Sequence, residues 1–166
     1  ELFIGIESGS PKILKAIYKT YDIGVIEKNL TKVFEAGINI KAYFIYGFPD
    51  ENEEDMKMTF ELAEKLKIVS QKNKVNFRTS VFQYRPYHGT EIYYNLEKKG
   101  FNLNVNATEP NKELCELVGR QQFNFHSGNY SEIEVGLVHS YIYRTINLNQ
   151  GKIFAGLESK ASSPYQ

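Results

Sequence analysis

The feature that most constrains the fold is residues 38–55, where an apolar run, a Gly-Phe-Pro turn and an acidic segment follow one another. Residues 38–46 are rich in β-branched and aromatic side chains, which predicts a largely buried strand. Gly47 allows a tight exit from that strand, and Pro49 restricts the residue before it to extended geometry. Five acidic residues then lie within 50–55, where a helix N-terminus favours negative charge. The stretch therefore predicts a strand, a turn and a helix over about 52–69.

Two similar units flank this one. Residues 2–6 predict a buried strand, and Ser10 and Pro11 are a candidate N-cap and a candidate first helical residue. The expected helices cover 11–19 and 23–36, the third strand covers 75–84, and a short helix covers 91–99. Alternation of strands and helices at this spacing indicates an α/β fold with a parallel sheet and right-handed crossovers.

The pattern changes after Gly100. We expect a mainly helical extension over 101–158, with its last helix beginning at a cap in 130–132 and running to about 148. The residues before that helix predict a polar loop, a short helix and an irregular or strand-like piece, at 102–110, 112–119 and 123–126. The tail, 159–166, is expected to be disordered.

Composition excludes several classes of function. The 166 residues include 20 basic and 20 acidic side chains, and this zero net charge argues against broad electrostatic binding to nucleic acid or to an anionic membrane. No segment predicts a membrane span or a signal peptide, and the single Cys115 suits a reducing compartment, so we expect a cytoplasmic protein with no nucleic-acid partner. The chain begins without methionine inside a strand-like run, so we expect a piece of a longer protein.

Polar residues at the strand exits are candidate ligand contacts. Glu7 and Ser8 follow the first strand, where a carboxylate and a hydroxyl can bind an amine or ribose hydroxyls. The alternative is that the serine satisfies the turn and the carboxylate is solvated. The acidic cluster within 50–55 is either a divalent-metal site or a solvated start of a helix, and the second interpretation is favoured.

The other reactive side chains have simpler interpretations. Tyr43, Tyr46 and Phe48 can present a ring or backbone to a planar ligand, but as apolar residues of such a strand they fit the core better. Cys115 lies among apolar neighbours and fits a small buried side chain better than a nucleophile. The three histidines show no spacing typical of a metal site.

Three strand exits taken together resemble a known family. They are GxESGS at 5–10, GFPxE at 47–51 and PxxGT at 86–90. In order and separation they resemble the second half of a radical S-adenosylmethionine (SAM) enzyme. The nearest resemblance is to the branch of cobalamin-dependent radical SAM methylases and coproporphyrinogen-oxidase-like proteins. The resemblance covers about residues 1–100.

The resemblance implies a partial (β/α)6 barrel, of which this chain carries about three parallel β/α units. It implies SAM and a [4Fe–4S] cluster as cofactors of the whole protein, and cobalamin in part of the branch. The CxxxCxxC loop that binds the cluster in the family is absent here, and one cysteine cannot supply three thiolates. The implied function is a C-terminal fragment that contributes SAM and substrate contacts to 5′-deoxyadenosyl-radical chemistry and cannot catalyse it alone.

The resemblance also implies individual contacts with SAM. Glu7 matches a polar residue that meets SAM, with Ser8 beside it, and Lys19 matches a basic residue in the following helix that reaches the SAM carboxylate. Tyr43 stands where some relatives bind the ribose with an acid. The remaining matches, which approach the adenine, are Tyr46, Gly47, Phe48, Tyr84 and Arg85.

Two other interpretations remain open from the sequence. One is a non-catalytic β/α module that binds a nucleotide or a protein. The other is a fragment of an ordinary (β/α)8-barrel enzyme, which does not explain the three exits jointly. Because half a barrel exposes the edges of its first and last strands, we also expect this piece to self-associate.

Overall fold

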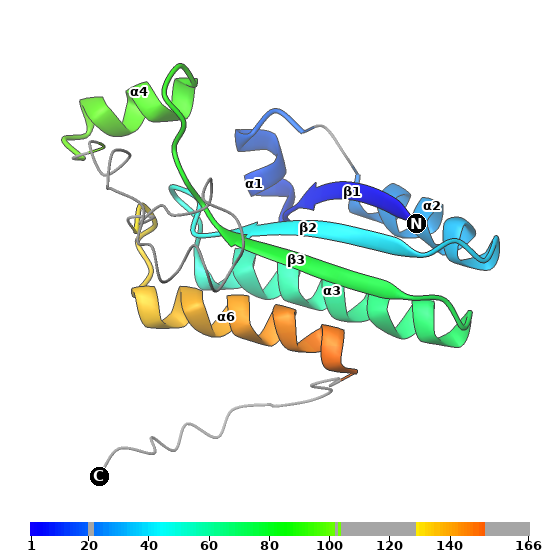
Figure 1. Ribbon diagram of the computed structural model, residues 1–166. Coiled ribbons are helices and arrows are strands. Elements are labelled where there is room, and N and C mark those ends of the chain that lie inside the picture. Colours follow the sequence, from blue (N-terminus) through cyan, green and yellow to red (C-terminus); the bar gives the residue numbers. More distant parts are fainter. Residues whose placement is uncertain (20–21, 102, 104–128, 152–166) are drawn as a thin grey trace, which may run out of the picture.

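The computed structural model describes residues 1–19, 22–101, 103 and 129–151 (Figure 1). Three parallel strands form one sheet in chain order, β1 (Leu2–Glu7), β2 (Ile40–Tyr46) and β3 (Phe77–Gln83). Each strand is followed by helix, which confirms the α/β fold with parallel β/α units.

The helices lie between and after these strands. None of them, within the described residues, has the length and apolar character needed to cross a membrane. In chain order they are α1 (Pro11–Ala16), α2 (Ile23–Glu35), α3 (Glu53–Lys72), α4 (Glu91–Lys98), α6 (Val135–Asn147) and the 3-10 helix η3 (Leu148–Gln150).

Helices α2, α3 and α6 cover one face of the sheet and form the main core with it (Figure 1). The alternation of β2 decides which side chains enter this core: Phe44 and Tyr46 are fully buried, whereas Tyr43 and Ile45 point to the other face and are half-buried. Within this core, the ring of Phe34 on α2 packs edge-to-face against the ring of Phe77 on β3. The two faces of β2 therefore have different roles, one in packing and one open to other contacts.

The pairing of β1 with β2 is irregular at its carboxyl end. The register is regular from Leu2 opposite Ile40 to Gly5 opposite Tyr43. Glu7 then lies opposite Phe44, so two steps along β1 correspond to one step along β2. Glu7 has a φ of 68°, a conformation that residues other than glycine rarely adopt. The strand thus ends in a bulge that changes the direction of the Glu7 side chain.

Helix α1 is shorter than the sequence predicts. It ends at Ala16, because Tyr18 adopts a left-handed φ of 57° that interrupts the helix. The Tyr18 hydroxyl donates to Glu91 on α4, 2.7 Å away. Lys19, expected within the helix, lies just after it, and its backbone N–H donates to the carbonyl of Leu14 at 2.8 Å.

The last helix also begins later than predicted. Residues 130–132 form no cap, and α6 begins at Val135. Asn129 Oδ1 accepts from both the backbone N–H and the hydroxyl of Ser131, and that hydroxyl accepts from the N–H of Ile133. These local bonds stabilise a turn in place of a helix start. The expectations for 104–110, 112–119, 123–126 and 159–166 lie outside the described residues.

The outer edge of β3 is partly covered. The Asn149 side chain accepts from the Thr79 N–H at 2.7 Å and donates to the Thr79 carbonyl at 2.9 Å, as a neighbouring strand would. This contact satisfies one position of an edge that would otherwise be open to pairing. Self-association of the chain stays a prediction.

Gly9 is required by the close approach of the β1 exit to α3. A Cβ at Gly9 would lie 2.5 Å from the Met58 carbonyl oxygen, which is backbone and cannot rotate away. We expect Gly9→Ala to lower the free energy of unfolding by about 1–3 kcal/mol, measured by urea denaturation followed by circular dichroism. Gly136→Ala is the matched control. Gly136 lies on α6, and a Cβ there would have its nearest neighbouring atom at 3.8 Å, an ordinary contact distance. Equal stability of the two variants would contradict the close approach.

Candidate functional site at the carboxyl end of the sheet

Buried hydrogen bonds tie the β1 exit to the first turns of α3. The Ser10 hydroxyl donates to Asp55 Oδ1 at 2.6 Å, and the Gly9 N–H donates to Thr59 Oγ1 at 2.9 Å. The hydroxyls of Ser8 and Thr59 also bond to each other, at 3.0 Å. Both serine side chains of this exit are thus bonded within the protein, and we call this set of contacts the exit joint.

Asp55 accepts most of the polar contacts of the joint. Besides Ser10, it receives the backbone N–H of Asn52 at 3.0 Å in a capping box and the Lys12 ammonium at 2.5 Å. Burial by itself would raise the pKa of Asp55, but the hydrogen bonds from Lys12 and Ser10 hold it below its usual value. The carboxylate therefore stays ionised inside the joint.

Glu51 is a buried acid that sequence reasoning did not single out. Its Oε2 accepts the backbone N–H groups of Gly47 and Phe48 at 2.5 and 3.1 Å, and its Oε1 is buried with no hydrogen-bond partner among the described residues. Burial raises the pKa of Glu51 to about 7. The position four residues after Gly47, inside the GFPxE motif, is the feature that could have indicated a carboxylate fixing the strand exit.

The favoured interpretation of the acidic cluster was wrong for these two residues. Glu51 is fully buried and Asp55 is 4% exposed, so neither is solvated. For Asp55 the reason is tertiary, because Ser10 and Lys12 reach it from the β1 exit and α1. For Glu51 the donors are local, since the N–H groups of Gly47 and Phe48 are only four and three residues away. Among the residues that the structure describes, no group of three or more acidic, histidine or cysteine side chains could hold a metal ion.

The structure brings Glu7 and Lys19 together. Glu7 Oε1 and Lys19 Nζ form an ion pair at 2.8 Å, and Nζ also donates to the Gly5 carbonyl at 3.0 Å. A Cβ at Gly5 would overlap the Glu7 carboxylate, so the first glycine of GxESGS leaves room for this pair. The two side chains are 18% and 28% exposed, which leaves both charged groups accessible from solvent.

Tyr43 lies on the open face of the sheet. Its ring stacks on Phe82 with centroids 6.2 Å apart and meets Phe3 edge-to-face at 6.5 Å. The Lys41 ammonium lies 5.4 Å from the Tyr43 ring centroid. Phe3 and Phe82 are 66% and 38% exposed, so this aromatic row faces outward.

The exits of β2 and β3 form a second aromatic group. Phe48 and Tyr84 are buried with ring centroids 4.9 Å apart, and Tyr130 contacts Tyr84 edge-to-face. Burial raises the pKa of Tyr84 to about 12 and lowers that of Arg85, whose guanidinium lies over the Tyr87 ring. Phe48, Tyr84 and Arg85 therefore lie at one end of the sheet, as the sequence predicts for neighbouring strand exits.

Tyr46 does not join this group. Its hydroxyl bonds to the Thr145 hydroxyl at 2.7 Å and its ring stacks on Tyr141, both on α6. Burial raises the pKa of Tyr46. The Tyr46 ring is part of the core, while the next residue, Gly47, has a φ of 87° and turns the chain toward the exit.

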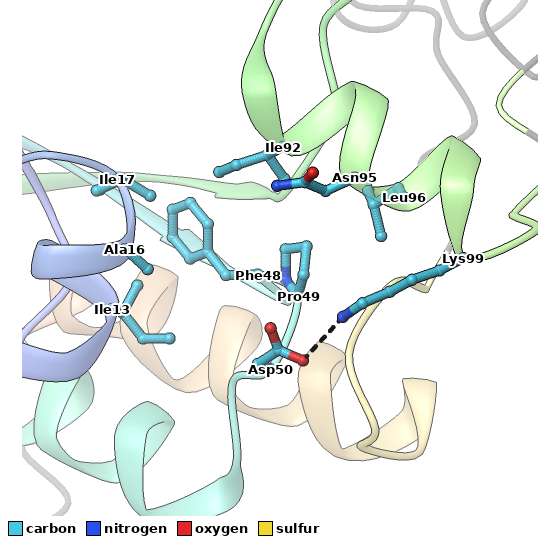
Figure 2. A pocket seen from close by; sticks show the side chains of 10 residues that line it. All are labelled: Ile13, Ala16, Ile17, Phe48, Pro49, Asp50, Ile92, Asn95, Leu96 and Lys99. Atoms are coloured by element: carbon cyan, nitrogen blue, oxygen red, sulfur yellow. Dashed lines mark hydrogen bonds and ion pairs between the residues drawn. The ribbon is translucent and has the colours of Figure 1, made fainter.

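A pocket of about 410 Å³ opens beside Phe48, between α1, the β2 exit and α4 (Figure 2). Its walls are mostly apolar, and the Asp50–Lys99 ion pair, at 3.4 Å, crosses one side. The lining residues are Ile13, Ala16, Ile17, Phe48, Pro49, Asp50, Ile92, Asn95, Leu96 and Lys99.

Comparison with known proteins supports membership of the matched region in the radical SAM superfamily. Residues 1–63, which contain β1, β2 and the first half of α3, match the family model described as Radical SAM superfamily. These findings support the radical SAM class for the matched region.

The relatives narrow this class. The chain is similar to proteins named tRNA-2-methylthio-N(6)-dimethylallyladenosine synthase. The one from Pelagibacter ubique (strain HTCC1062) is 31% identical over 122 residues, 72% of this chain and 24% of the relative. The one from Paracoccus denitrificans (strain Pd 1222) is 32% identical over 124 residues, 73% of this chain and 25% of the relative. The one from Petrotoga mobilis (strain DSM 10674 / SJ95) is 29% identical over 153 residues, which are 85% of this chain and 32% of the relative. The chain thus spans about a quarter of the length of the first of these relatives.

Two expectations from the sequence change with these findings. The relatives are named as tRNA-modifying synthases, so they do not support the cobalamin-dependent or coproporphyrinogen-oxidase-like branch, nor cobalamin as a cofactor. Their names also include tRNA, which conflicts with the expectation of no nucleic-acid partner. That expectation rested on net charge, and net charge does not exclude an RNA bound mainly by other parts of a longer protein.

The raised pKa of Glu51 predicts a pH-dependent stability. The unfolded chain loses this proton near the ordinary value of 4.5, and the folded chain loses it near 7. The free energy of unfolding therefore falls as pH rises from about 4.5 to about 7, through this group, and levels off above that. Glu51→Gln removes this titration. The difference in unfolding free energy, variant minus parent, should therefore increase by up to about 3 kcal/mol as pH rises from about 4.5 to about 7.

Urea denaturation at a series of pH values measures this difference. Glu53→Gln is the control, because Glu53 is an exposed carboxylate in the first turn of the same helix. Parallel stability curves for the parent and Glu51→Gln would show that Glu51 titrates normally.

Proposed function

We propose that this chain is the SAM-binding C-terminal part of a radical SAM enzyme that modifies an adenosine in tRNA. The observation that carries the proposal is the Glu7–Lys19 ion pair, which lies at a bulged strand exit inside the segment that matches the superfamily. A carboxylate and an ammonium held side by side suit a ligand that carries both charges, as the methionine end of SAM does.

The pair fits this ligand through exchange of partners. In the ligand-bound state Glu7 accepts from the SAM ammonium or from ribose hydroxyls, and Lys19 donates to the SAM carboxylate. Both groups are only partly buried, so the desolvation cost of this exchange is small compared with that of a fully buried pair. Ser8 contributes through the exit joint, because its hydroxyl is already bonded to Thr59.

The proposed contacts with the adenosine come from the other exits. Arg85 offers a guanidinium for the adenine beside the buried rings of Phe48 and Tyr84, which support the exit, and Tyr43 offers a ring on the open face. Tyr46 and Gly47 contribute backbone, since the Tyr46 ring belongs to the core. Glu51 fixes this backbone by accepting the N–H groups of Gly47 and Phe48.

The donor set for the cluster is not in this chain, whose one cysteine cannot supply three thiolates. In the whole protein, SAM with the cluster supplies the 5′-deoxyadenosyl radical, and the residues described here bind and orient the adenosine and methionine parts. The names of the relatives point to a base bearing an N(6)-dimethylallyl group as substrate. With zero net charge, this piece contributes few of the phosphate contacts that tRNA binding needs. A cytoplasmic location stays a prediction.

The test is calorimetric titration of SAM and of 5′-deoxyadenosine into the full-length enzyme and its variants. Lys19→Ala should weaken SAM binding roughly tenfold or more, the effect of losing a charged hydrogen bond of about 1.5–3 kcal/mol, and should weaken 5′-deoxyadenosine less because that ligand has no carboxylate. Glu7→Gln should weaken SAM less than Glu7→Ala, because it keeps an acceptor oxygen.

Circular dichroism controls for folding of each variant, and Lys15→Ala controls for loss of a nearby exposed ammonium on α1. Equal weakening of both ligands by Lys19→Ala would refute the carboxylate contact. Parental SAM affinity in Glu7→Ala would mean that this exit is a structural turn, and SAM binding would then have to lie elsewhere.

A further inference from the structure

The pocket between α1, the β2 exit and α4 is largely separate from the proposed SAM contacts, with which it shares only Phe48. We propose that this pocket binds the branched, five-carbon dimethylallyl group on N6 of the substrate adenosine. This inference rests on the proposed function, since it names where the substrate of that same site is held.

The chemistry of the walls favours a branched hydrocarbon. Ile17, Ile92 and Pro49 are half-buried and present apolar surface to the pocket, and the buried Ile13, Phe48 and Leu96 lie behind them (Figure 2). A hydrocarbon group entering this space gains by leaving water and needs no polar partner. A charged or strongly hydrated group would lose its hydration against the same walls.

The pocket is already formed by the fold. Ile13, Phe48 and Leu96 belong to one core cluster and are 1%, 3% and 2% exposed, so packing holds their positions. A preformed apolar site binds without the cost of ordering its walls.

The size and rim suit a modified base better than a free hydrocarbon. A volume of about 410 Å³ lies within the range of small-molecule sites and exceeds what five carbons fill, so part of the purine can enter as well. Asn95 lines the pocket with an exposed amide, which can both donate to and accept from a purine edge. Asp50 and Lys99 close one side with an exposed ion pair.

The position places substrate and SAM at one end of the sheet. The walls come from α1, which follows Glu7 and the exit joint, and from the residues that follow β2 (Figure 1). In parallel β/α folds the ligands bind at the carboxyl ends of the strands. A base held in this pocket is therefore at the same end of the sheet as the Glu7–Lys19 pair.

The experiment compares two tRNAs that differ only in this group. Full-length enzyme is titrated with one tRNA carrying a single N6-dimethylallyladenosine and with the same tRNA carrying adenosine there. The variant is Ala16→Phe, because Ala16 is an exposed residue of the pocket wall whose enlarged side chain would fill the space. Ala36→Phe is the matched control, at an exposed position after α2 that does not line the pocket.

We expect the parent and Ala36→Phe to bind the dimethylallyl tRNA roughly tenfold or more tighter than the unmodified tRNA. Ala16→Phe should bring this ratio close to one while SAM affinity, measured by calorimetry, stays at the parental value. An unchanged ratio in Ala16→Phe, or a ratio of one in the parent, would overturn the proposal while leaving SAM binding intact.

Two other outcomes would also overturn it, and they separate it from the proposed function. Loss of SAM affinity in Ala16→Phe with the tRNA ratio unchanged would show that the pocket holds the adenine of SAM, so the SAM function would stand and the substrate assignment would fall. Absence of SAM binding in the parent enzyme would refute both.

Discussion

The arrangement of the site depends on the buried carboxylate of Asp55. It closes the capping box of α3, accepts from Ser10 of the β1 exit and pairs with Lys12 of α1. One ionised group thereby fixes three elements relative to one another, and its burial is tolerated because both carboxylate oxygens have donors. Removing it would leave the Ser10 hydroxyl and the α3 cap without an acceptor, at the point where the two exits meet.

The two strand exits are fixed by different means. The β1 exit needs glycine at Gly9 to approach the α3 backbone, and Gly5 leaves room for the Glu7–Lys19 pair in the position that it adopts here. The β2 exit needs a buried acceptor, Glu51, for two consecutive N–H groups. The GxESGS and GFPxE motifs thus encode packing and hydrogen bonding around the partly exposed Glu7–Lys19 pair, with few side chains left over for ligand contact.

The sequence predicts the sheet and the first four helices because their hydrophobic periods are local. It also predicts that the residues at the three exits lie near one another, since parallel strands end at one edge of a sheet. It does not predict that Asp55 is buried, because Ser10 and Lys12 reach it from a distant segment. It does not single out Glu51 either, although the donors to Glu51, the N–H groups of Gly47 and Phe48, are only four and three residues away. It leaves open whether Tyr46 meets a ligand or the core, and the strand alternation turns its ring toward α6, a distant helix whose contact no local pattern shows.

The central claim is that the β1 exit and the start of α3 form one energetic unit through Ser10 and Asp55. A double-mutant cycle of Ser10→Ala and Asp55→Ala, with unfolding free energies from urea denaturation, tests it most directly. We predict a coupling of about 0.5–3 kcal/mol between the two positions. The control cycle pairs Ser10→Ala with Asn73→Ala at the far end of α3, where the effects should add. Additive effects of Ser10→Ala and Asp55→Ala would contradict the account.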